Sequence, residues 1–327
     1  MSYVLGVDAG NSKTFALVAA SDGRVLGFGR AGPGNHQTVG LGPALGEIQR
    51  ACVEACAQAG VRLPVTLGVF GLAGADLPED FELLRTHLAE RSLAHRIRVE
   101  NDTLVALRAG TRRPWGVVVV CGAGFNAAGI APDGRVFRLP GLGWISGDRG
   151  GGAFLAQEAV RHVARAWDGR GDPTLLTPLV LQALGLTSVE ELIVSLYHGR
   201  VEESKLLGLV PQIFEAAYAG DRVAQQLLVQ LGEEVGCTAG ASIRRLGLEQ
   251  TDVEVVLAGG VFKGKGPLLW DTITQVVHRT APRAQIVRPP FAPVVGAVLL
   301  ALEEIRGFLE PEIRENLERS LPAELRE

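Results

Sequence analysis

Short runs of β-branched and other apolar residues alternate along the chain with segments of helical periodicity. In the first third, the apolar runs predict strands, and apolar positions three and four apart predict helices. The predicted strands cover residues 3–7, 14–20, 25–30, 65–71 and 96–100, and the predicted helices cover residues 43–59, 79–90 and 103–109. This order, βββαβαβα, indicates a mixed α/β sheet flanked by helices.

The strand pattern restarts after Arg112-Arg113-Pro114, which is the best candidate for a domain boundary. Strands are predicted at 117–120, 127–131, 253–257 and 285–287, and helices at 153–166, 268–279 and 293–302. Residues 172–248 carry helical periodicity almost throughout and form a helical insertion or lobe. The tail, residues 303–327, is predicted as one charged amphipathic helix that is either solvated or packed.

Two segments of the chain repeat one pattern. Residues 3–25 read YVLGVDAGNSKTFALVAASDGRV, and residues 115–136 read WGVVVVCGAGFNAAGIAPDGRV. Each predicts a β-hairpin with a glycine-rich turn, and glycine lets backbone amides approach an anion closely. One such turn in each half indicates a duplicated domain, with two phosphate-binding loops facing each other across a cleft.

Composition narrows the possible classes of protein. The chain has 327 residues, 47% hydrophobic residues, 42 glycines and a net charge of −4. This length suits two domains, and the lack of a basic patch with aromatic residues argues against a nucleic-acid partner. No apolar run reaches membrane-spanning length, and Asp8 interrupts the first one, which argues against a signal peptide. The four cysteines show no metal-binding spacing; Cys52 and Cys56, four apart on one predicted helix face, are expected to be small buried residues, and a reducing cytoplasm is expected.

The first glycine turn carries several groups that can bind a nucleotide. Gly10 and Asn11 form the turn, Ser12 and Thr14 add hydroxyls, and Lys13 adds a cation. Asp8 ends the preceding strand, where a carboxylate can hold a hydrated Mg²⁺. An ordinary tight hairpin explains the same residues, so the loop alone does not decide the function.

Two further segments allow a functional and a structural interpretation. Gly122, Ala123 and Gly124 repeat the glycine turn in the second half, ahead of Phe125 and Asn126. Asn101-Asp102 lies at a strand-to-helix junction, where either residue can cap the helix. The alternative is that Asp102 is a general base that takes a proton from a substrate hydroxyl.

Glycine-rich loops supply the remaining candidates. Asn35 and the Gly147-Asp148 pair are either turn formers or ligands of sugar hydroxyls, and Trp144 is either a core residue or the wall of a pocket. Gly259 and Gly260 end a strand ahead of Lys263, where the backbone can lie flat against a planar base or simply turn.

These segments, in this order, resemble the acetate and sugar kinase, Hsp70 and actin superfamily. The closer resemblance, up to about residue 302, is to the BadF/BadG/BcrA/BcrD ATPase family and its N-acetylglucosamine kinase branch. It implies two duplicated ribonuclease-H-like domains with ATP between them. The first would cover residues 1–112 and be rejoined by 293–327, and the second would cover 113–292, with the insertion at about 172–248.

The resemblance also implies a role for each candidate residue. Asp102 is the implied catalytic base, and Asp8 the residue that holds Mg²⁺. The residues implied for ATP are Asp8, Gly10, Asn11, Ser12, Lys13, Thr14, Gly122, Ala123, Gly124, Gly259, Gly260 and Lys263. The residues implied for the sugar are Asn35, Asp102, Trp144, Gly147 and Asp148.

The function implied is ATP-dependent phosphorylation of a sugar or amino sugar, most simply N-acetylglucosamine or glucosamine at O6, by a cytoplasmic homodimer. Two departures stand out: Ala123 and Phe125 replace the usual hydroxyl residues, and Arg149 replaces an acidic one. The alternatives are an iron–sulfur ATPase activator of a 2-hydroxyacyl-CoA dehydratase and a non-catalytic ATP or sugar sensor. Kinases with the ROK signature are disfavoured because their zinc-binding cysteines are missing.

Overall fold

A computed structural model describes residues 2–326, except for the side chains of residues 203 and 204. The chain divides into two compact units. Unit 1 comprises Met1–Val118, Ala128–Pro140 and Val287–Glu327, and unit 2 comprises Val119–Ala127 and Gly141–Ile286. With two five-stranded sheets and flanking helices, the predicted α/β class is confirmed.

Unit 1 is built on a sheet with the strand order β3-β2-β1-β4-β5. β1 lies antiparallel to β2 and parallel to β4, which in turn lies parallel to β5. The bounds of the five strands are β1 Tyr3–Ala9, β2 Thr14–Ala20, β3 Val25–Ala31, β4 Val65–Leu72 and β5 Ala94–Asn101.

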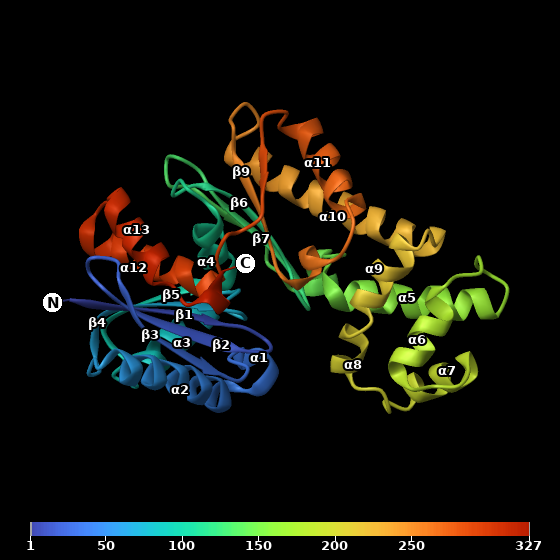
Figure 1. Ribbon diagram of the computed structural model, residues 1–327, viewed down its shortest axis with the longest axis horizontal. Helices are drawn as coiled ribbons and strands as arrows, with labels where there is room; N and C mark the ends of the chain where they lie inside the picture. Colours follow the sequence, from blue (N-terminus) through green and yellow to red (C-terminus); the bar gives the residue numbers. More distant parts are fainter. Residues whose placement is uncertain (1, 327) are drawn as a thin grey trace. The chain divides into compact units, whose positions relative to one another are not determined.

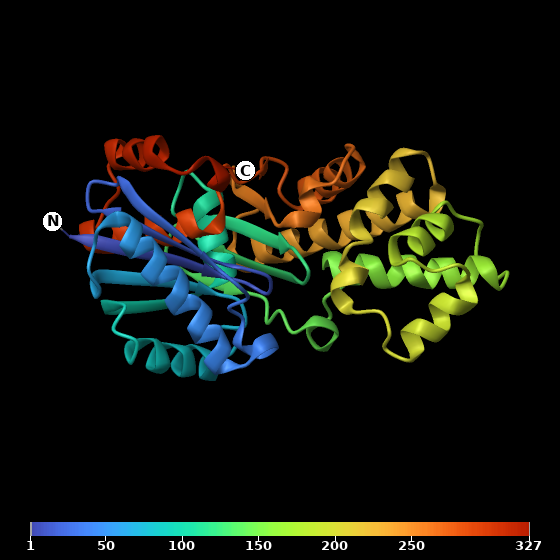
Figure 2. The same ribbon diagram turned by 60° about the horizontal axis from the view of Figure 1, so that its bottom comes forward.

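Helices cover both faces of this sheet (Figures 1 and 2). α2 and α3 pack against Leu5 and Val7 on one face, while α12 and the end of the chain pack against Val4 and Leu17 on the other. Neighbouring residues of β1 therefore enter different cores, as the alternation of a strand requires. The helices of unit 1 are α1 His36–Val39, α2 Leu41–Ala59, α3 Pro78–Ala89, α4 Asp102–Gly110, α12 Pro293–Arg306 and α13 Pro311–Ser320, with a short 3₁₀ turn at Ala323–Leu325.

Glycines allow α4 and α12 to approach the sheet and each other closely. A Cβ on Gly71 would lie 2.4 Å from Val105 of α4, and one on Gly6 would lie 2.6 Å from Val298 of α12. A Cβ on Gly296 would lie only 1.9 Å from the carbonyl oxygen of Val105, where α12 meets α4. The first turn of α4 is thereby held close over the carboxyl ends of β1 and β4.

The second sheet has the strand order β10-β9-β6-β7-β8. Its strands are β6 Gly116–Cys121, β7 Phe125–Ile130, β8 Val136–Arg138, β9 Glu254–Ala258 and β10 Gln285–Val287. The helices of unit 2 are α5 Gly151–Trp167, α6 Leu176–Leu184, α7 Val189–Tyr197, α8 Glu203–Leu207, α9 Val210–Tyr218, α10 Arg222–Leu246 and α11 Leu268–Thr280, with 3₁₀ turns η1 Gly143–Ser146 and η2 Gly260–Lys263.

The helical prediction for residues 172–248 agrees with helices α6 to α10. No single helix within residues 2–326 has the length and apolarity to cross a bilayer; α6 and α7, bent by 53°, meet that test only as a pair and only by length and composition.

The structure differs from the sequence prediction at three places. The short helix α1 and the strand β8 were not predicted. The prediction of one helix over residues 303–327 is wrong: α12 ends at Arg306, and Gly307, with φ 77°, stops it before α13 begins. Glycine adopts this left-handed conformation without strain and ends helices for that reason. The last residue of the predicted tail, Glu327, lies outside the described residues.

Candidate active site

Two carboxylates lie at the carboxyl ends of parallel strands in unit 1. Asp8 pairs with Gly71 of β4 in the sheet register, and the next register position joins Leu72 to Asn101, the last residue of β5. Asp102 follows directly as the first residue of α4. The carboxyl edge of a parallel sheet is where such folds bind ligands.

Each of these two aspartates is harder to ionise than a free one. The pKa of Asp8 rises from 3.8 to about 7, mainly because it is buried and then because Asp102 repels a second negative charge, while Lys13 lowers it. The pKa of Asp102 rises to about 6, again chiefly by burial and then by the charge of Asp76. A carboxyl group with a pKa near 6 is more basic than an ordinary aspartate, which suits proton acceptance.

The structure separates the two interpretations of Asn101-Asp102. Asn101 is the cap: its side chain accepts a hydrogen bond from the Thr103 amide at 3.1 Å, and its residue is fully buried. Asp102 occupies the first helical position, where the backbone amide of Thr103 lowers its pKa but does not outweigh burial. The cap and the candidate base are therefore adjacent residues with different tasks.

The sequence analysis missed a third carboxylate, Asp76, and a cation, Arg138. Asp76 lies in the loop after β4, where its Oδ1 accepts from Asn101 Nδ2 at 3.0 Å. Arg138 ends β8 and donates to the carbonyl oxygens of Ala75 and Asp76, each at 2.7 Å. The signal for Asp76 was present, because it follows a buried strand of the same parallel set. No sequence pattern around Arg138 indicates a role in the site, because only the fold brings this residue to the loop after β4.

The first glycine loop presents Asn11, Ser12 and Lys13 to solvent. The Gly10 amide donates to the Lys13 carbonyl at 2.9 Å and closes the turn. Thr14 does not join the exposed residues, because it is fully buried and its hydroxyl donates to the Gly32 carbonyl at 2.8 Å. Its side chain therefore fixes the hairpin, while the loop residues before it stay accessible.

Asn35 connects this loop to helix α1. Its Nδ2 donates to Asn11 Oδ1 at 2.7 Å, and its Oδ1 accepts from the Gln37 amide at 2.9 Å. Asn35 is only 6% exposed. Gly74, with φ 83°, approaches so closely that a Cβ there would lie 2.4 Å from Asn35 Oδ1. The side chain is thus fixed between the Asn11 turn and the loop after β4.

The second glycine loop, in unit 2, is held by its carbonyl groups. The amides of Gly152 and Ala153, at the start of α5, donate to the carbonyls of Gly122 and Ala123 at 2.7 and 3.0 Å. In a planar trans peptide the next N–H points opposite to the carbonyl. The amides of Ala123 and Gly124 therefore point away from α5, and both residues are exposed. Such a pair of amides can bind an anion without any hydroxyl side chain.

Phe125 does not enter the space outside this loop. It is 8% exposed, and its ring lies against Gly150, where a Cβ would come within 2.2 Å of the ring. Phe125, which replaces the hydroxyl residue usual in the family, therefore packs inside unit 2 and leaves the exposed side of the loop free of its ring.

The other candidates in unit 2 lie in turns. Asp148 Oδ2 accepts from Ser146 Oγ at 2.7 Å and from the Gly143 amide at 2.9 Å, so its carboxylate closes the turn that contains Gly147, whose φ is 82°. Trp144 stands 87% exposed on η1. Arg149 attracts Glu234, whose pKa is raised by burial and by Asp148 but lowered by Arg149.

The strand end at Gly259 lies against the second glycine loop. A Cβ on Gly259, with φ 114°, would lie 2.4 Å from the Cys121 carbonyl, while Gly260 has open space around it and precedes Lys263 in η2. Burial raises the pKa of the Cys121 thiol to about 12. Cys121 is therefore a neutral, buried thiol in the folded chain.

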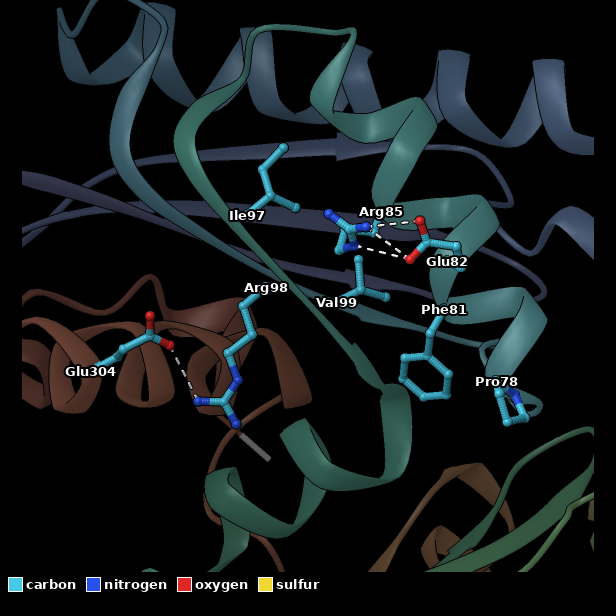
Figure 3. Close-up of a pocket in the computed structure, with 8 residues that line it drawn as sticks. All are labelled: Pro78, Phe81, Glu82, Arg85, Ile97, Arg98, Val99 and Glu304. Atoms are coloured by element: carbon cyan, nitrogen blue, oxygen red, sulfur yellow. Dashed lines mark hydrogen bonds and ion pairs between the residues drawn. The ribbon is translucent and has the colours of Figure 1, made fainter.

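A cavity of about 450 Å³ in unit 1 lies apart from these carboxylates. It lies at the edge strand β5, whose Ile97, Arg98 and Val99 line it together with residues of α3, and Arg98 points toward Glu304 of α12 (Figure 3). Arg98 pairs with Glu304 at 3.4 Å, and Arg85 pairs with Glu82 at 2.8 Å. Its charged groups are thus neutralised within the unit.

The carboxylate of Asp8 fits a hydrated Mg²⁺, which leaves Asp102 as the candidate base. Within residues 2–326, no three or more His, Cys, Asp or Glu side chains converge on one point. Mg²⁺ is usually held by one or two carboxylates together with waters and substrate phosphates. A cation beside Asp8 would also offset the repulsion that raises its pKa.

A match to a family model shows to which protein family the chain belongs. The model of the BadF/BadG/BcrA/BcrD ATPase family matches residues 5–301. The chain belongs to this family. Among the curated relatives of the chain, the N-acetyl-D-glucosamine kinase of Dictyostelium discoideum is 31% identical over 91% of the chain and 97% of that protein.

Two further proteins are similar to the chain over nearly its whole length. The N-acetylmuramic acid/N-acetylglucosamine kinase of Clostridium acetobutylicum is 28% identical over 93% of the chain and 99% of that protein. A solved structure from Chromobacterium violaceum, which carries a provisional N-acetylglucosamine kinase name, matches with a TM-score of 0.72 and 26% identity, over 92% of the chain and 99% of its own. The resemblance stated from the motifs is thereby confirmed.

Proposed function

We propose that this ATPase-family protein is an ATP-dependent kinase of an amino sugar, with N-acetylglucosamine as the first substrate to test. The observation that carries the proposal is the pair Asp8 and Asp102 at the carboxyl ends of β1 and β5. Relatives of similar length bear the names of N-acetylglucosamine and N-acetylmuramic acid kinases. The panel of test sugars therefore includes both.

Asp102 is the base in this proposal. A sugar hydroxyl, O6 in the simplest case, hydrogen-bonds to the Asp102 carboxylate and loses its proton as the oxygen attacks the terminal phosphorus of ATP. The bond from that phosphorus to the bridging oxygen breaks, and ADP leaves. Burial supports this role, because it makes Asp102 basic enough to accept the proton near neutral pH.

The two glycine loops are the proposed phosphate ligands. The exposed amides of Ala123 and Gly124 and the exposed Lys13 can stabilise negative charge on phosphate oxygens. When bound, Mg²⁺ would neutralise charge on the transferred group, with Asp8 holding it through water. Of the sugar contacts, Asn35 supports the loop around Asn11 and so shapes the site even where it does not touch the substrate.

The test is ADP release with Mg·ATP over a panel of sugars that contains N-acetylglucosamine, N-acetylmuramic acid, glucosamine, N-acetylmannosamine and glucose. Release that depends on one amino sugar is the expected result. Asp102→Asn should lower kcat by about 10²-fold or more, since a positioned base contributes roughly 10²–10⁴-fold. Affinity for ATP should stay within about twofold. Full turnover in this variant would contradict the assignment of the base.

Sugar-independent ADP release would instead favour the activator or the sensor. Iron and sulfide analysis of anaerobically purified protein separates those two. Because Cys121 is a buried thiol, we expect neither iron nor sulfide. The implied homodimer is a separate proposal, which light scattering of the purified chain tests.

A further inference from the structure

The loop after β4 is fixed by side chains from several separate segments. Gln37 Nε2 donates to the Gly74 carbonyl at 3.0 Å. Asp80 Oδ2, in the first turn of α3, accepts from the Leu77 amide at 2.8 Å. Asn101 Nδ2 donates to the Ala75 carbonyl at 3.0 Å. This loop therefore has little freedom on either side of Asp76.

Arg138 completes this arrangement from β8. Its two terminal nitrogens bind consecutive carbonyls, those of Ala75 and Asp76, and its guanidinium lies 4.8 Å from the centre of the Phe81 ring. Strand pairing of Arg138 with Ala128 of β7 fixes its backbone. Because the guanidinium is planar and donates to two neighbouring carbonyls, it fixes the orientation of this piece of main chain as well as its distance from β8. A lysine, with a single ammonium group, cannot fix the orientation.

Asp76 connects the fixed loop to the start of α4. Its Oδ1 accepts from Asn101 Nδ2, and the Oδ1 of Asn101 accepts from the amide of Thr103, the second residue of the helix. Arg138 holds the main chain at Ala75 and Asp76, and Asn101 binds the Ala75 carbonyl and the Asp76 carboxylate, so this loop connects Arg138 to the start of α4 and to Asp102. The negative charge of Asp76 also raises the pKa of Asp102, after the larger effect of burial, and the charge of Arg138 lowers it.

We propose that Asp76 and Arg138 are positioning residues for phosphoryl transfer, holding Asp102 in place through Asn101. The inference rests on the proposed function, because it takes Asp102 as the base. It goes further by assigning a task to two residues to which the proposed function gives no contact with ATP or with the transferred group. Displacement of a reacting group by about 1 Å can cost about 10²-fold in rate.

A pair of substitutions at Asp76 separates its hydrogen bond from its charge. Asp76→Asn keeps an oxygen that can accept from Asn101, whereas Asp76→Ala removes it. We expect Asp76→Ala to lower kcat by about tenfold or more, with KM for ATP within about twofold. Asp76→Asn should recover a large part of that loss. Equal kcat for the wild type and Asp76→Ala would overturn the role of Asp76.

A second pair tests Arg138 with an arginine from the same hairpin as control. Arg138→Met should lower kcat by about tenfold, and Arg138→Lys should recover part of it. Arg135 is exposed and pairs with Asp133, so Arg135→Met should leave kcat within about twofold of the wild type. If Arg138→Met does not fold, the Lys variant decides the question, since an unchanged kcat there excludes the need for a planar guanidinium.

The double variant Asp76→Ala/Arg138→Met shows whether the two residues act together. If both act through Asn101, the double variant should lose little more kcat than the worse single variant. Losses that multiply would mean independent effects and would overturn the shared role. Wild-type turnover and Asp102→Asn are measured in the same series. Turnover that is absent in the wild type, or retained without Asp102, refutes the proposed function, whereas an unaffected Arg138→Lys refutes only this inference.

Discussion

At the scale of single residues, the site keeps acidic groups in surroundings that favour their neutral forms. The pKa of Asp8 is about 7 and that of Asp102 about 6, in each case chiefly through burial. In the folded chain, each group therefore binds its proton more tightly than in the unfolded chain, where aspartate titrates near 3.9. Function and stability oppose each other here, since proton acceptance needs the charged form that the fold disfavours.

The opposition predicts a pH dependence of stability. Between pH 4 and pH 7 the native state holds more protons than the unfolded state, so these two groups make the free energy of unfolding fall as pH rises. In magnesium-free buffer, Asp8→Asn should raise Tm relative to the wild type at pH 8, and the gain should shrink toward pH 4.5. Thermal denaturation at both pH values measures this.

Asp133 supplies the control for that measurement. It is exposed, and Arg135 holds the pKa of its carboxyl below the usual value. Asp133→Asn should therefore give no gain in Tm at pH 8. A gain of equal size in both variants would mean that overall charge, and not burial at the site, is responsible.

At the scale of elements, the sequence predicts strands well where apolar runs are buried, as in β1, β4 and β6. It fails for β8, whose three residues form a strand only through pairing with β7. The same limit applies to the site. Local pattern places Asp8 and Asp102 at strand ends, although the role of Asp102 as a base came only from the family resemblance. Arg138 reaches the Asp76 loop only because distant segments pair.

The position of α4 depends on glycines that no propensity scale singles out. Gly296→Ala should displace α12 from α4, because its Cβ would lie 1.9 Å from the Val105 carbonyl. Overpacking of this kind costs about 1–3 kcal/mol of unfolding free energy. Since α4 begins with Asp102, kcat should fall as well. Urea denaturation and steady-state kinetics measure the two effects.

Gly46 is the matched control within a helix. It lies exposed in α2, and a Cβ there would meet nothing within 4 Å. Gly46→Ala should stabilise the chain by up to about 1 kcal/mol, as alanine favours helix over glycine. Loss of stability in both variants would show that close helix contact is not the cause at Gly296.

At the scale of the whole molecule, segments far apart in the sequence pack together in unit 1. The hairpin between β2 and β3 lies against α13: Asn316 Nδ2 donates to the Asp22 carbonyl at 2.9 Å, and Ser320 Oγ accepts from the Val25 amide at 2.9 Å. The sequence left open whether the tail is solvated or packed. Its apolar residues among many charges allow either, and only the partner surface on β2, β3 and α12 decides for packing.

Leu317 therefore belongs to the core of the first sheet, although it lies near the end of the chain. It is 1% exposed and shares a cluster with Val4, Leu17 and Leu299. Leu317→Ala should destabilise the protein by about 2–5 kcal/mol, whereas Glu315→Ala, on the exposed side of the same helix, should change stability by less than about 0.5 kcal/mol. Denaturant midpoints of the two variants measure the difference. Equal midpoints would place α13 outside the cooperative unit, and Asp102 would then be held by the sheet, α4 and α12 alone.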